Sequence, residues 1–343
     1  MEFPVKELKR WFLANRRDLP WRESPSPYRV WISEVMLQQT QVSVVIPYFL
    51  RWMEKFPTIE LLAKAPLEQV IKLWEGLGYY SRARHLHEAA GFLVQRHGGE
   101  LPSDPKLLQE IKGLGPYTIG AIRSFAFKER SAAVDGNVIR VLSRFFAISA
   151  EIDQKVTRKI TALAEEMLPE KEPWLVTEGL IELGALICTK EPSCQECPLR
   201  DRCTGFRHGL ERKLPNKKKR VETTFLRRSL AIVECGGYFL LVKGERGQVM
   251  SDLYEFPYLP HEETSFEKLT ADFAALLGIS LKFQKAYPTE QHSFTRYRVT
   301  LFPYHFRAET LHEKGNWVEQ DRLHTLPFSS GHKRVLAMLG ESR

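Results

Sequence analysis

This sequence has no long apolar run, no secretory signal and few cysteines, and each absence narrows its class. No apolar stretch is long enough to span a bilayer. The first residues lack the basic, apolar and small-residue layout of an export signal. We therefore expect a cytoplasmic protein without membrane contact. In that reducing setting, the five cysteines among 343 residues are expected to bind metal rather than to form disulfides.

Internal repeats and low-complexity segments are also absent, and the excess charge is confined to one stretch. The net charge is +8, and residues 200–228 carry eleven Lys or Arg against three acidic residues, so the remainder is balanced. A polyanion such as nucleic acid is the natural partner of this basic stretch. A solvated tether between domains, including Lys217, Lys218, Lys219 and Arg220, explains the linker part equally well.

Four of the cysteines lie within sixteen residues, separated by gaps of five, two and five residues. These are Cys188, Cys194, Cys197 and Cys203. Four thiolates at such spacing can saturate one zinc ion or one iron–sulfur cluster. The spacing alone does not separate these two metal centres.

The hydrophobic pattern changes after about residue 205. Before it, apolar residues with a 3.6-residue period predict helices over 67–75, 82–95, 105–111, 117–127, 137–147, 155–168 and 174–187. After the basic stretch, a Gly236-Gly237 turn predicts a β-hairpin over 230–243. Further predicted elements are a helix at 266–277, strands at 281–287 and 297–306, and a helix at 331–339. The sequence thus predicts a multi-domain chain, with an all-α domain over 1–205, a linker over 206–227 and an α+β domain over 228–343.

Two carboxyl groups are candidates for chemistry. Glu34 lies in an otherwise apolar helix, where lost hydration would raise its pKa and make it a general acid. A Glu at the helix edge, paired with an Arg, is the alternative. Asp135 precedes a predicted helix, so it is either a plain N-cap or a carboxylate that stabilises a developing cation. One protonated and one ionised carboxyl are the usual means of breaking a glycosidic bond.

Two further motifs suggest contact with nucleic acid. The stretch 111–122 places Gly113, Gly115 and Thr118 in a tight turn between helices, where free backbone N–H groups can bind phosphate. A generic turn is the alternative. Tyr79 lies on another turn beside basic side chains, where it is either part of the core or exposed and able to wedge into a base stack.

Taken together, these residues resemble the MutY family of adenine DNA glycosylases, in the helix-hairpin-helix superfamily. The specific strings run from Trp31 to Thr40 and from Val134 to Val138. The resemblance covers the chain through Cys203 and, more loosely, the rest. It implies a helical domain with a 4Fe–4S cluster, a Nudix-like lesion-recognition domain, and excision of adenine opposite 8-oxoguanine or guanine in duplex DNA. We therefore expect a monomeric, nucleoid-associated protein of the bacterial type.

The resemblance also implies a role for each candidate residue. Glu34 matches the general acid that protonates adenine, and Asp135 the carboxylate that stabilises the sugar cation. Tyr117 and Asn137 match residues beside that sugar. The remaining positions match the family's adenine pocket and DNA contacts, namely Leu19, Trp21, Arg22, Gln38, Gln39, Thr40, Tyr79, Gly113, Gly115, Thr118 and Glu178.

This sequence departs from the family pattern at two places. The first cysteine gap is five residues, whereas the family usually has six. The family's Phe-Ser-His loop, which contacts 8-oxoguanine, matches Phe294, Thr295 and Arg296 here. An ordinary strand entry is the alternative for this loop.

Rival functions differ from this one at single features. An endonuclease III-like pyrimidine glycosylase with lyase activity would have lysine where Tyr117 stands, because a tyrosine cannot form the required imine. A non-catalytic DNA-binding protein with structural zinc would not need both Glu34 and Asp135. A Nudix hydrolase is disfavoured because the second domain lacks the Nudix catalytic box. That domain is therefore expected to recognise rather than to hydrolyse.

Overall fold

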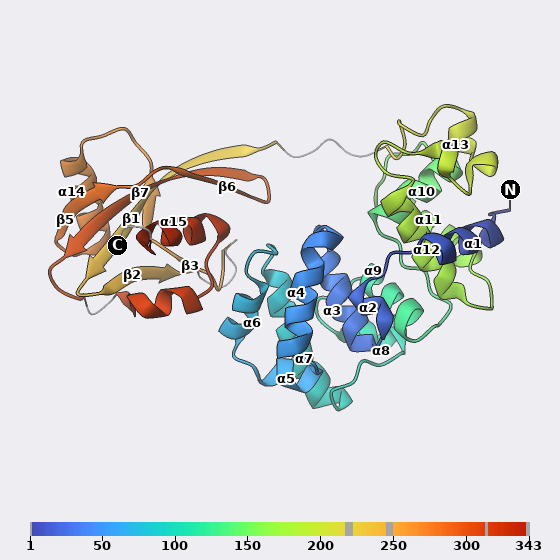
Figure 1. Cartoon of the computed structure of the whole chain (residues 1–343), viewed down its shortest axis with the longest axis horizontal. Coiled ribbons are helices and arrows are strands. Elements are labelled where there is room, and N and C mark those ends of the chain that lie inside the picture. Colours follow the sequence, from blue (N-terminus) through green and yellow to red (C-terminus); the bar gives the residue numbers. More distant parts are fainter. Residues whose placement is uncertain (1, 217–221, 245–249, 313–314, 341–343) are drawn as a thin grey trace. The chain divides into compact units, whose positions relative to one another are not determined.

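The computed structural model describes residues 2–216, 222–244, 250–312 and 315–340, so residues 217–221 of the expected basic linker lie outside the described residues. The chain divides into two compact units. The first comprises residues 1–64 and 85–219 and is helical (Figure 1). The second comprises residues 65–84 and 220–343 and contains the β-sheet. No helix in the described ranges is long and apolar enough to cross a membrane.

The helices of the first unit agree with the predicted ranges to within two residues, with one exception. The predicted helix at 117–127 is α-helical only to Ala121 and continues as a π-helical turn, η1, over Ile122–Ala126. The helix bounds are α1 Val5–Asn15, α2 Pro20–Glu23, α3 Pro27–Leu37, α4 Val42–Lys55, α5 Ile59–Lys64, α7 Ser81–His97, α8 Pro105–Glu110, α9 Pro116–Ala121, α10 Gly136–Phe145, α11 Gln154–Glu166, α12 Pro173–Leu186, η2 Cys194–Glu196, η3 Arg200–Arg202 and α13 Thr204–Arg207.

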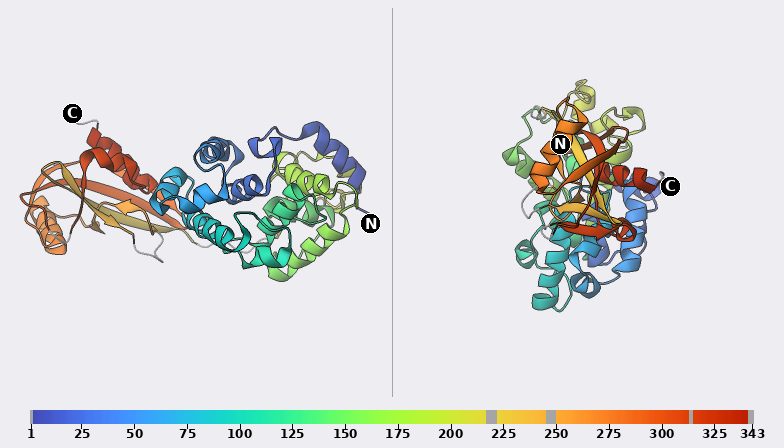
Figure 2. Two further views of the ribbon diagram at one scale, coloured as in Figure 1. Left: turned by 90° about the horizontal axis from the view of Figure 1, so that it is seen from below. Right: turned by 90° about the vertical axis from the view of Figure 1, so that its left-hand side faces the viewer.

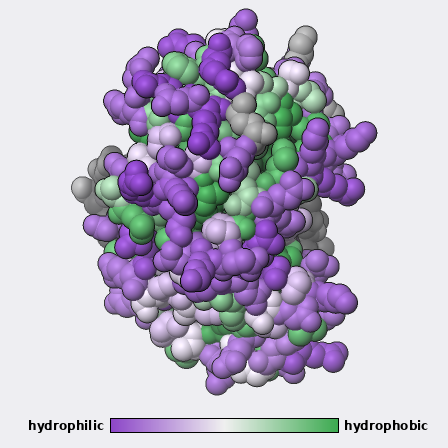
Figure 3. Space-filling model, turned by 90° about the vertical axis from the view of Figure 1, so that its right-hand side faces the viewer, coloured by the Kyte–Doolittle hydropathy of each residue, from purple (hydrophilic) through white to green (hydrophobic). Residues whose placement is uncertain are grey.

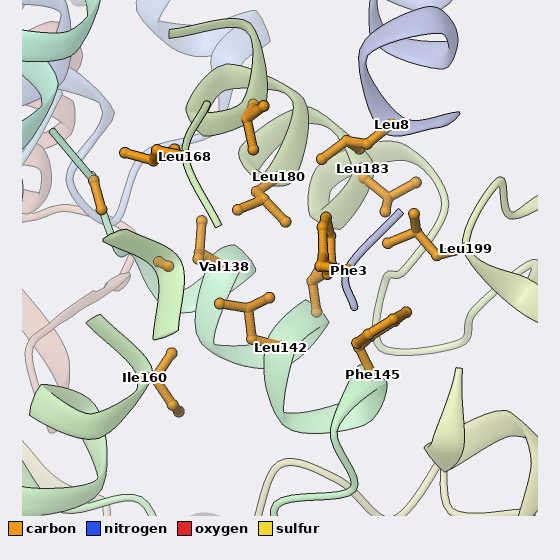
Figure 4. Close-up of a cluster of buried hydrophobic side chains, with 14 residues drawn as sticks. Phe3, Leu8, Val138, Leu142, Phe145, Ile160, Leu168, Leu180, Leu183 and Leu199 are labelled. Carbon is orange, nitrogen blue, oxygen red and sulfur yellow. The ribbon is translucent and has the colours of Figure 1, made fainter. Parts of the chain in front are cut away.

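One hydrophobic core of this unit lies between α10 and α12. Leu142 and Phe145 on α10 pack with Leu180 and Leu183 on α12, and Leu8 of α1 joins them (Figure 4). The two helices approach closely at Gly184, where an added Cβ would lie 2.6 Å from the Cβ of Asn137. This packing fixes the N-terminus of α10. On the face shown in Figure 3, mainly hydrophilic side chains surround the hydrophobic residues that remain visible.

The second unit is a mixed sheet between helices, which agrees with the predicted α+β class. β1 (Thr224–Cys235) and β7 (Tyr297–Ala308) run parallel at its centre, from the pair Thr224–Tyr297 to the pair Glu234–Arg307. α14 (Phe266–Leu277) packs on one face of β1, and α15 (Ser330–Gly340) packs on the other (Figure 2). The other elements are α6 Leu67–Trp74, β2 Tyr238–Lys243, β3 Tyr254–Glu255, β4 Tyr258–Pro260, β5 Leu281–Ala286, β6 Glu290–Phe294, β8 Asn316–Glu319 and η4 Gln320–Thr325.

Strand β6 was not predicted, and it changes the structural context of residues 294–296. β6 pairs antiparallel with β7, and the last pair joins Phe294 to Tyr297. Thr295 and Arg296 therefore form a two-residue hairpin turn, in which Thr295 has a positive φ of 47°. The alternating pattern that predicts strands is weak in β6, because Glu290, Gln291 and Ser293 are polar.

Candidate active site

The two candidate carboxyl groups line one cavity of about 260 Å³ in the first unit. Glu34 comes from α3 and Asp135 from the N-terminus of α10, 101 positions later in the sequence. The predicted residues that share this lining are Leu19, Trp21, Arg22, Gln38, Thr40, Tyr117, Asn137 and Glu178. The helical fold thus brings together most of the residues predicted for catalysis and for the adenine pocket.

Glu34 is buried, with 5% of the residue exposed, and its partner is a tyrosine rather than the arginine considered from the sequence. Tyr117 at the start of α9 donates a 2.5 Å hydrogen bond from its hydroxyl to Oε2 of Glu34. Burial raises the pKa of Glu34 to about 7, the hydrogen bond from Tyr117 lowers it, and the nearby charge of Asp135 raises it. Glu34 can therefore hold a proton near neutral pH. Burial likewise raises the pKa of Tyr117 well above its ordinary value, so the hydroxyl keeps its proton.

Asp135 is the N-cap of α10, as its sequence position indicates. Its Oδ1 accepts backbone N–H bonds from Asn137 at 2.9 Å and Val138 at 2.8 Å. Its Oδ2 accepts a 2.7 Å bond from the side-chain amide of Asn137. Burial raises the pKa of Asp135, whereas these three hydrogen bonds favour its ionised form. Capping and a catalytic role are compatible here, because the capped carboxylate still lines the cavity.

A network of charges forms another wall of the cavity. Arg22 contacts Glu178 at 2.9 Å and Glu182 at 3.1 Å. Glu182 is fully buried and also accepts bonds from the backbone N–H and the guanidinium of Arg17. Burial would raise the pKa of Glu182, but the bonds from Arg17 and Arg22 outweigh it and lower the pKa to about 2. Glu178 behaves differently, because burial raises its pKa more than Arg22 lowers it.

Sequence reasoning missed four charged residues of this lining, which are Arg16, Arg17, Lys128 and Glu182. Lys128 has a positive φ of 59°, and its ammonium lies 4.9 Å from the ring centroid of Trp174. Burial lowers its pKa. A Glu four residues after Glu178, on the same face of α12, was the available signal for Glu182. Lys128 carried no such signal, because it lies in a turn without a motif.

Arg140 connects the carboxylate site to the cysteine loop. One of its terminal nitrogens donates to Oδ1 of Asn137 at 2.8 Å, and its Nε donates to the carbonyl of Cys188 at 2.7 Å. Since Asn137 donates to Asp135, a continuous chain of hydrogen bonds runs from the backbone of Cys188 to the capped carboxylate.

The four clustered cysteines are half-buried and line a shared space of about 30 Å³. Within the described ranges, no three His, Cys, Asp or Glu side chains form a group that could hold a single metal ion. Four thiols around a common space are nevertheless the ligand set of either one zinc ion or one iron–sulfur cluster. Buried Arg144 donates to Sγ of Cys188 at 3.3 Å.

The predicted DNA-contacting residues of the first unit flank the cavity. Gly113 has a positive φ of 89°, and Gly115 is the N-cap residue of α9. The Oγ1 of Thr118 accepts a 3.5 Å bond from the side chain of Gln38. Gln39 follows α3 with a positive φ of 58°, a strained conformation for a residue with a side chain. The helix hairpin is thus connected to the turn that carries Gln39.

A second cavity, of about 600 Å³, lies within the second unit. Tyr79, Phe294 and Thr295 line it, whereas Arg296 is not among its lining residues and donates to the hydroxyl of Tyr297. Tyr79 is 44% exposed and has a positive φ of 48°. Two buried polar atoms of lining residues, Nε2 of His292 and Oγ of Ser329, have no hydrogen-bond partner within the described part of the chain. Such atoms indicate a site that a polar ligand would satisfy.

Comparisons with known proteins agree with this arrangement. Residues 32–166 match the HhH-GPD superfamily of base excision DNA repair proteins, and residues 229–338 match the NUDIX domain. The chain is 32% identical to the human adenine DNA glycosylase, over 95% of this chain and 72% of that protein. It is 37% identical to the adenine DNA glycosylase of Buchnera aphidicola (strain Bp), over 71% and 70%.

The rat adenine DNA glycosylase is 44% identical over 58% of this chain, but the match spans only 40% of the rat protein. Among solved structures, a thermostable thymine-DNA glycosylase superposes with a TM-score of 0.56 at 27% identity, covering 60% of this chain and 95% of that one. An endonuclease III–DNA covalent intermediate superposes with a TM-score of 0.52 at 23% identity, covering 60% and 95%, which shows a shared fold alone.

Proposed function

Because the chain belongs to the adenine DNA glycosylase family, we propose that it hydrolyses the N-glycosidic bond of adenine mispaired with 8-oxoguanine or guanine in duplex DNA. The observation that carries this proposal is the cavity shared by Glu34 and Asp135. Burial raises the pKa of Glu34 to about 7. Burial raises the pKa of Asp135 as well, but three hydrogen bonds to its carboxylate oppose that rise. An acid and an anion on one cavity are the pair that this cleavage needs.

In the proposed reaction, Glu34 donates its proton to N7 of the flipped adenine, which makes the base a better leaving group. Tyr117 holds Oε2 of Glu34 in place. The carboxylate of Asp135 then stabilises the oxocarbenium-like sugar, and water adds to C1′. Trp21 and Leu19 line the base pocket, and the Arg22–Glu178 pair supplies its polar groups.

Adenine must leave the base stack before this chemistry. Extrusion costs a few kcal/mol, which is offset when side chains fill the gap and when the protein binds flanking phosphates. Gln39 and Tyr79 each have a positive φ and are exposed, so both side chains are accessible to DNA. The backbone N–H groups of Gly115, Tyr117 and Thr118 at the N-terminus of α9 suit a phosphate.

Recognition of the opposite base is assigned to the cavity of the second unit. Its aromatic wall, formed by Tyr79 and Phe294, suits stacking on a purine. The hydroxyl of Thr295, and Nε2 of His292 and Oγ of Ser329, which have no partner among the described residues, suit the extra N–H and C=O groups of 8-oxoguanine. Arg296 stands where the family has histidine, and its exposed guanidinium suits a phosphate rather than the base.

The cysteine loop is proposed to hold one 4Fe–4S cluster on Cys188, Cys194, Cys197 and Cys203. Arg144 donates a hydrogen bond to Sγ of Cys188, so a cationic side chain lies beside the proposed cluster ligands. When bound, the cluster supplies a rigid cross-link of the loop. The chain's own Lys190, Arg200 and Arg202 then face a polyanion. An absorbance shoulder near ~400 nm with iron on analysis is expected, and zinc at one equivalent would contradict the cluster.

The enzyme is proposed to be monofunctional, because Tyr117 replaces the lysine that forms an imine in lyases. Lys128 places an amine in the lining of the cavity, and burial lowers its pKa. Borohydride trapping on substrate DNA separates the cases. Little covalent adduct is expected for the wild type. A high yield that disappears in Lys128→Gln would overturn monofunctionality and identify the amine.

The proposed activity is tested by single-turnover assays on duplexes with adenine opposite 8-oxoguanine, guanine or thymine. Alkali treatment of half of each sample separates base loss from strand scission. Glu34→Gln is expected to bind the mispair and to lose excision by about 10²–10⁴-fold, the contribution typical of a general acid. The exposed Glu7→Gln serves as a matched control with wild-type rates. Unchanged excision in Glu34→Gln would contradict the assignment.

A further inference from the structure

The segment that carries Tyr79 belongs by its contacts to the second unit, although the sequence places it among the helices of the first. It contains α6, which ends at Trp74, and the turn that follows. Glu75 is the C-cap residue of α6. Among the described residues, three ionic contacts join this segment to residues beyond 240, and these three lie within the second unit. Glu75 makes the most buried of the three.

The carboxylate of Glu75 connects the two halves of the second unit. Only 5% of its side chain is exposed. Oε1 accepts a 2.9 Å bond from the backbone N–H of Phe328, and Oε2 lies 2.5 Å from the ammonium of Lys333. Lys72 reaches the same Oε2 at 3.1 Å and also donates to the carbonyl of Leu326 at 2.8 Å. A buried carboxylate with this many donors is held in one position.

Two further contacts are set along the same segment. Arg84 donates to Asp252 at 2.6 Å and to Ser251 at 2.9 Å. Glu68 lies 3.3 Å from the ammonium of Lys243 and also accepts a 2.8 Å bond from the hydroxyl of Tyr254. These contacts lie on either side of Glu75 in the sequence, so the segment cannot pivot about Glu75 alone.

The turn after Glu75 is rigid in itself, so a shift of Glu75 would be transmitted to Tyr79. Trp74 donates from Nε1 to the carbonyl of Gly78 at 3.1 Å. Buried Arg82 donates to the carbonyls of Leu77 and Gly78. The guanidinium of Arg82 also lies 5.7 Å from the ring centroid of Tyr79.

Phe328, whose backbone N–H binds Glu75, is adjacent in sequence to residues of the opposite wall of the cavity. Phe328 immediately precedes Ser329 and Ser330, which line the cavity together with Thr295. One carboxylate thus bridges the wall that carries Tyr79 and the wall that carries the two serines. Its position sets the width of the space between them.

We infer that Glu75 is a positioning residue for mispair recognition. It fixes Tyr79 against the wall formed by residues 293–295 and 329–330, so that the cavity accepts the damaged purine in preference to guanine. The inference rests on the proposed function and deepens it, because it assigns base discrimination to a residue that lines neither catalytic nor lesion-facing surface.

The test compares wild type, Glu75→Gln and Lys333→Gln in the full-length protein. Single-turnover excision of adenine is measured opposite 8-oxoguanine and opposite guanine. Glutamine keeps an oxygen for the Phe328 N–H but loses attraction for both lysines. The ratio of the two rates is expected to fall about tenfold in Glu75→Gln, the effect typical of losing a charge-assisted bond. The rate opposite guanine, which reports the intact catalytic unit, is expected to stay unchanged.

Further variants test whether this effect depends on the contact between Glu75 and Lys333. The side chain of Lys333 is 57% exposed, so Lys333→Gln is expected to lower the ratio of the two rates less than Glu75→Gln does. Combining the two substitutions is expected to add little, because both remove the same Glu75–Lys333 contact. Lys9→Gln, which removes an exposed ion pair of the first unit, is the control with a wild-type ratio.

The outcomes separate this inference from the proposed function. A wild-type ratio of the two rates in Glu75→Gln would overturn the positioning role. Equal losses of rate on both substrates would also overturn it, and would indicate that Glu75 has a structural role only. If the wild type itself showed no preference for 8-oxoguanine, the proposed lesion recognition would fail instead, whatever the variants do.

Discussion

The hydroxyl of Tyr117 donates a 2.5 Å hydrogen bond to the carboxyl of Glu34 at the base of the first cavity. Burial raises the pKa of this carboxyl, and the bond, which stabilises the carboxylate, partly offsets that rise, so that the pKa is about 7. The enzyme thereby keeps its acid within the range where it can both hold and release a proton. Burial alone would place the pKa higher.

The pH dependence of excision should therefore report Glu34 directly. Protonated Glu34 is the active form, so the single-turnover rate should decline as pH rises through about 7. In Tyr117→Phe the lowering bond is lost, so the pKa should rise and the declining limb should move to higher pH. A limb that moves to lower pH, or that persists in Glu34→Gln, would contradict the assignment of this titration.

A second expectation concerns stability. The pKa of Glu34 is 4.5 unperturbed and about 7 when folded, so the folded state binds more protons. Ionising this buried group thus costs stability as pH rises from 4.5 through 7, by at most about 3 kcal/mol. Glu34→Gln should raise the Tm by a few degrees at pH 8 and leave it unchanged at pH 4. Thermal unfolding followed by circular dichroism at both pH values measures this, and a lower Tm at pH 8 would contradict it.

The sequence contained most of the local structure and part of the site. The N-cap at Asp135 and the Gly236-Gly237 turn follow from local chemistry, because a cap or a tight turn depends on a few neighbouring residues. The bond between Glu34 and Tyr117 joins residues 83 positions apart, and only tertiary packing determines which side chain reaches a buried carboxyl. An arginine partner at the helix edge was the alternative reading of Glu34 from the sequence.

Longer-range features were beyond prediction for the same reason. The parallel pairing of β1 with β7 joins strands separated by more than sixty residues. The grouping of residues 65–84 with the second unit depends on ionic contacts such as Glu75 with Lys333. Lys128 reaches the cavity from a turn that has no motif. None of these relations leaves a periodic pattern in the sequence.

A third expectation concerns the link to the cysteine loop. Arg140 holds the amide of Asn137, which donates to Asp135, and it binds the carbonyl of Cys188. Arg140→Gln should lower the excision rate about tenfold, because losing charge-assisted bonds leaves Asn137 free to turn. Single-turnover rates and iron content should be measured together. Arg158→Gln, at an exposed position of α11, is the control, and a wild-type rate in Arg140→Gln would show that the link is dispensable.

The fourth expectation tests how the fold delivers Asp135 to the cavity. The backbone of Ala132, three residues before Asp135, passes so close to Gly120 of α9 that an added Cβ would overlap the Ala132 carbonyl oxygen. Gly120→Ala should therefore displace this segment and destabilise the protein by about 1–3 kcal/mol. Because the displaced segment ends at Asp135, the excision rate should fall more than the loss of folded protein explains.

A matched glycine makes this expectation specific. Gly91 lies within α7, and an added Cβ there would meet no atom within 4 Å. Gly91→Ala should leave excision unchanged and stabilise the helix by about 0.5–1 kcal/mol, since alanine loses less backbone entropy on folding. Thermal unfolding and single-turnover excision on the same preparations distinguish the two substitutions. If Gly120→Ala matched Gly91→Ala in both measurements, the close approach at Ala132 would not be what places Asp135 in the cavity.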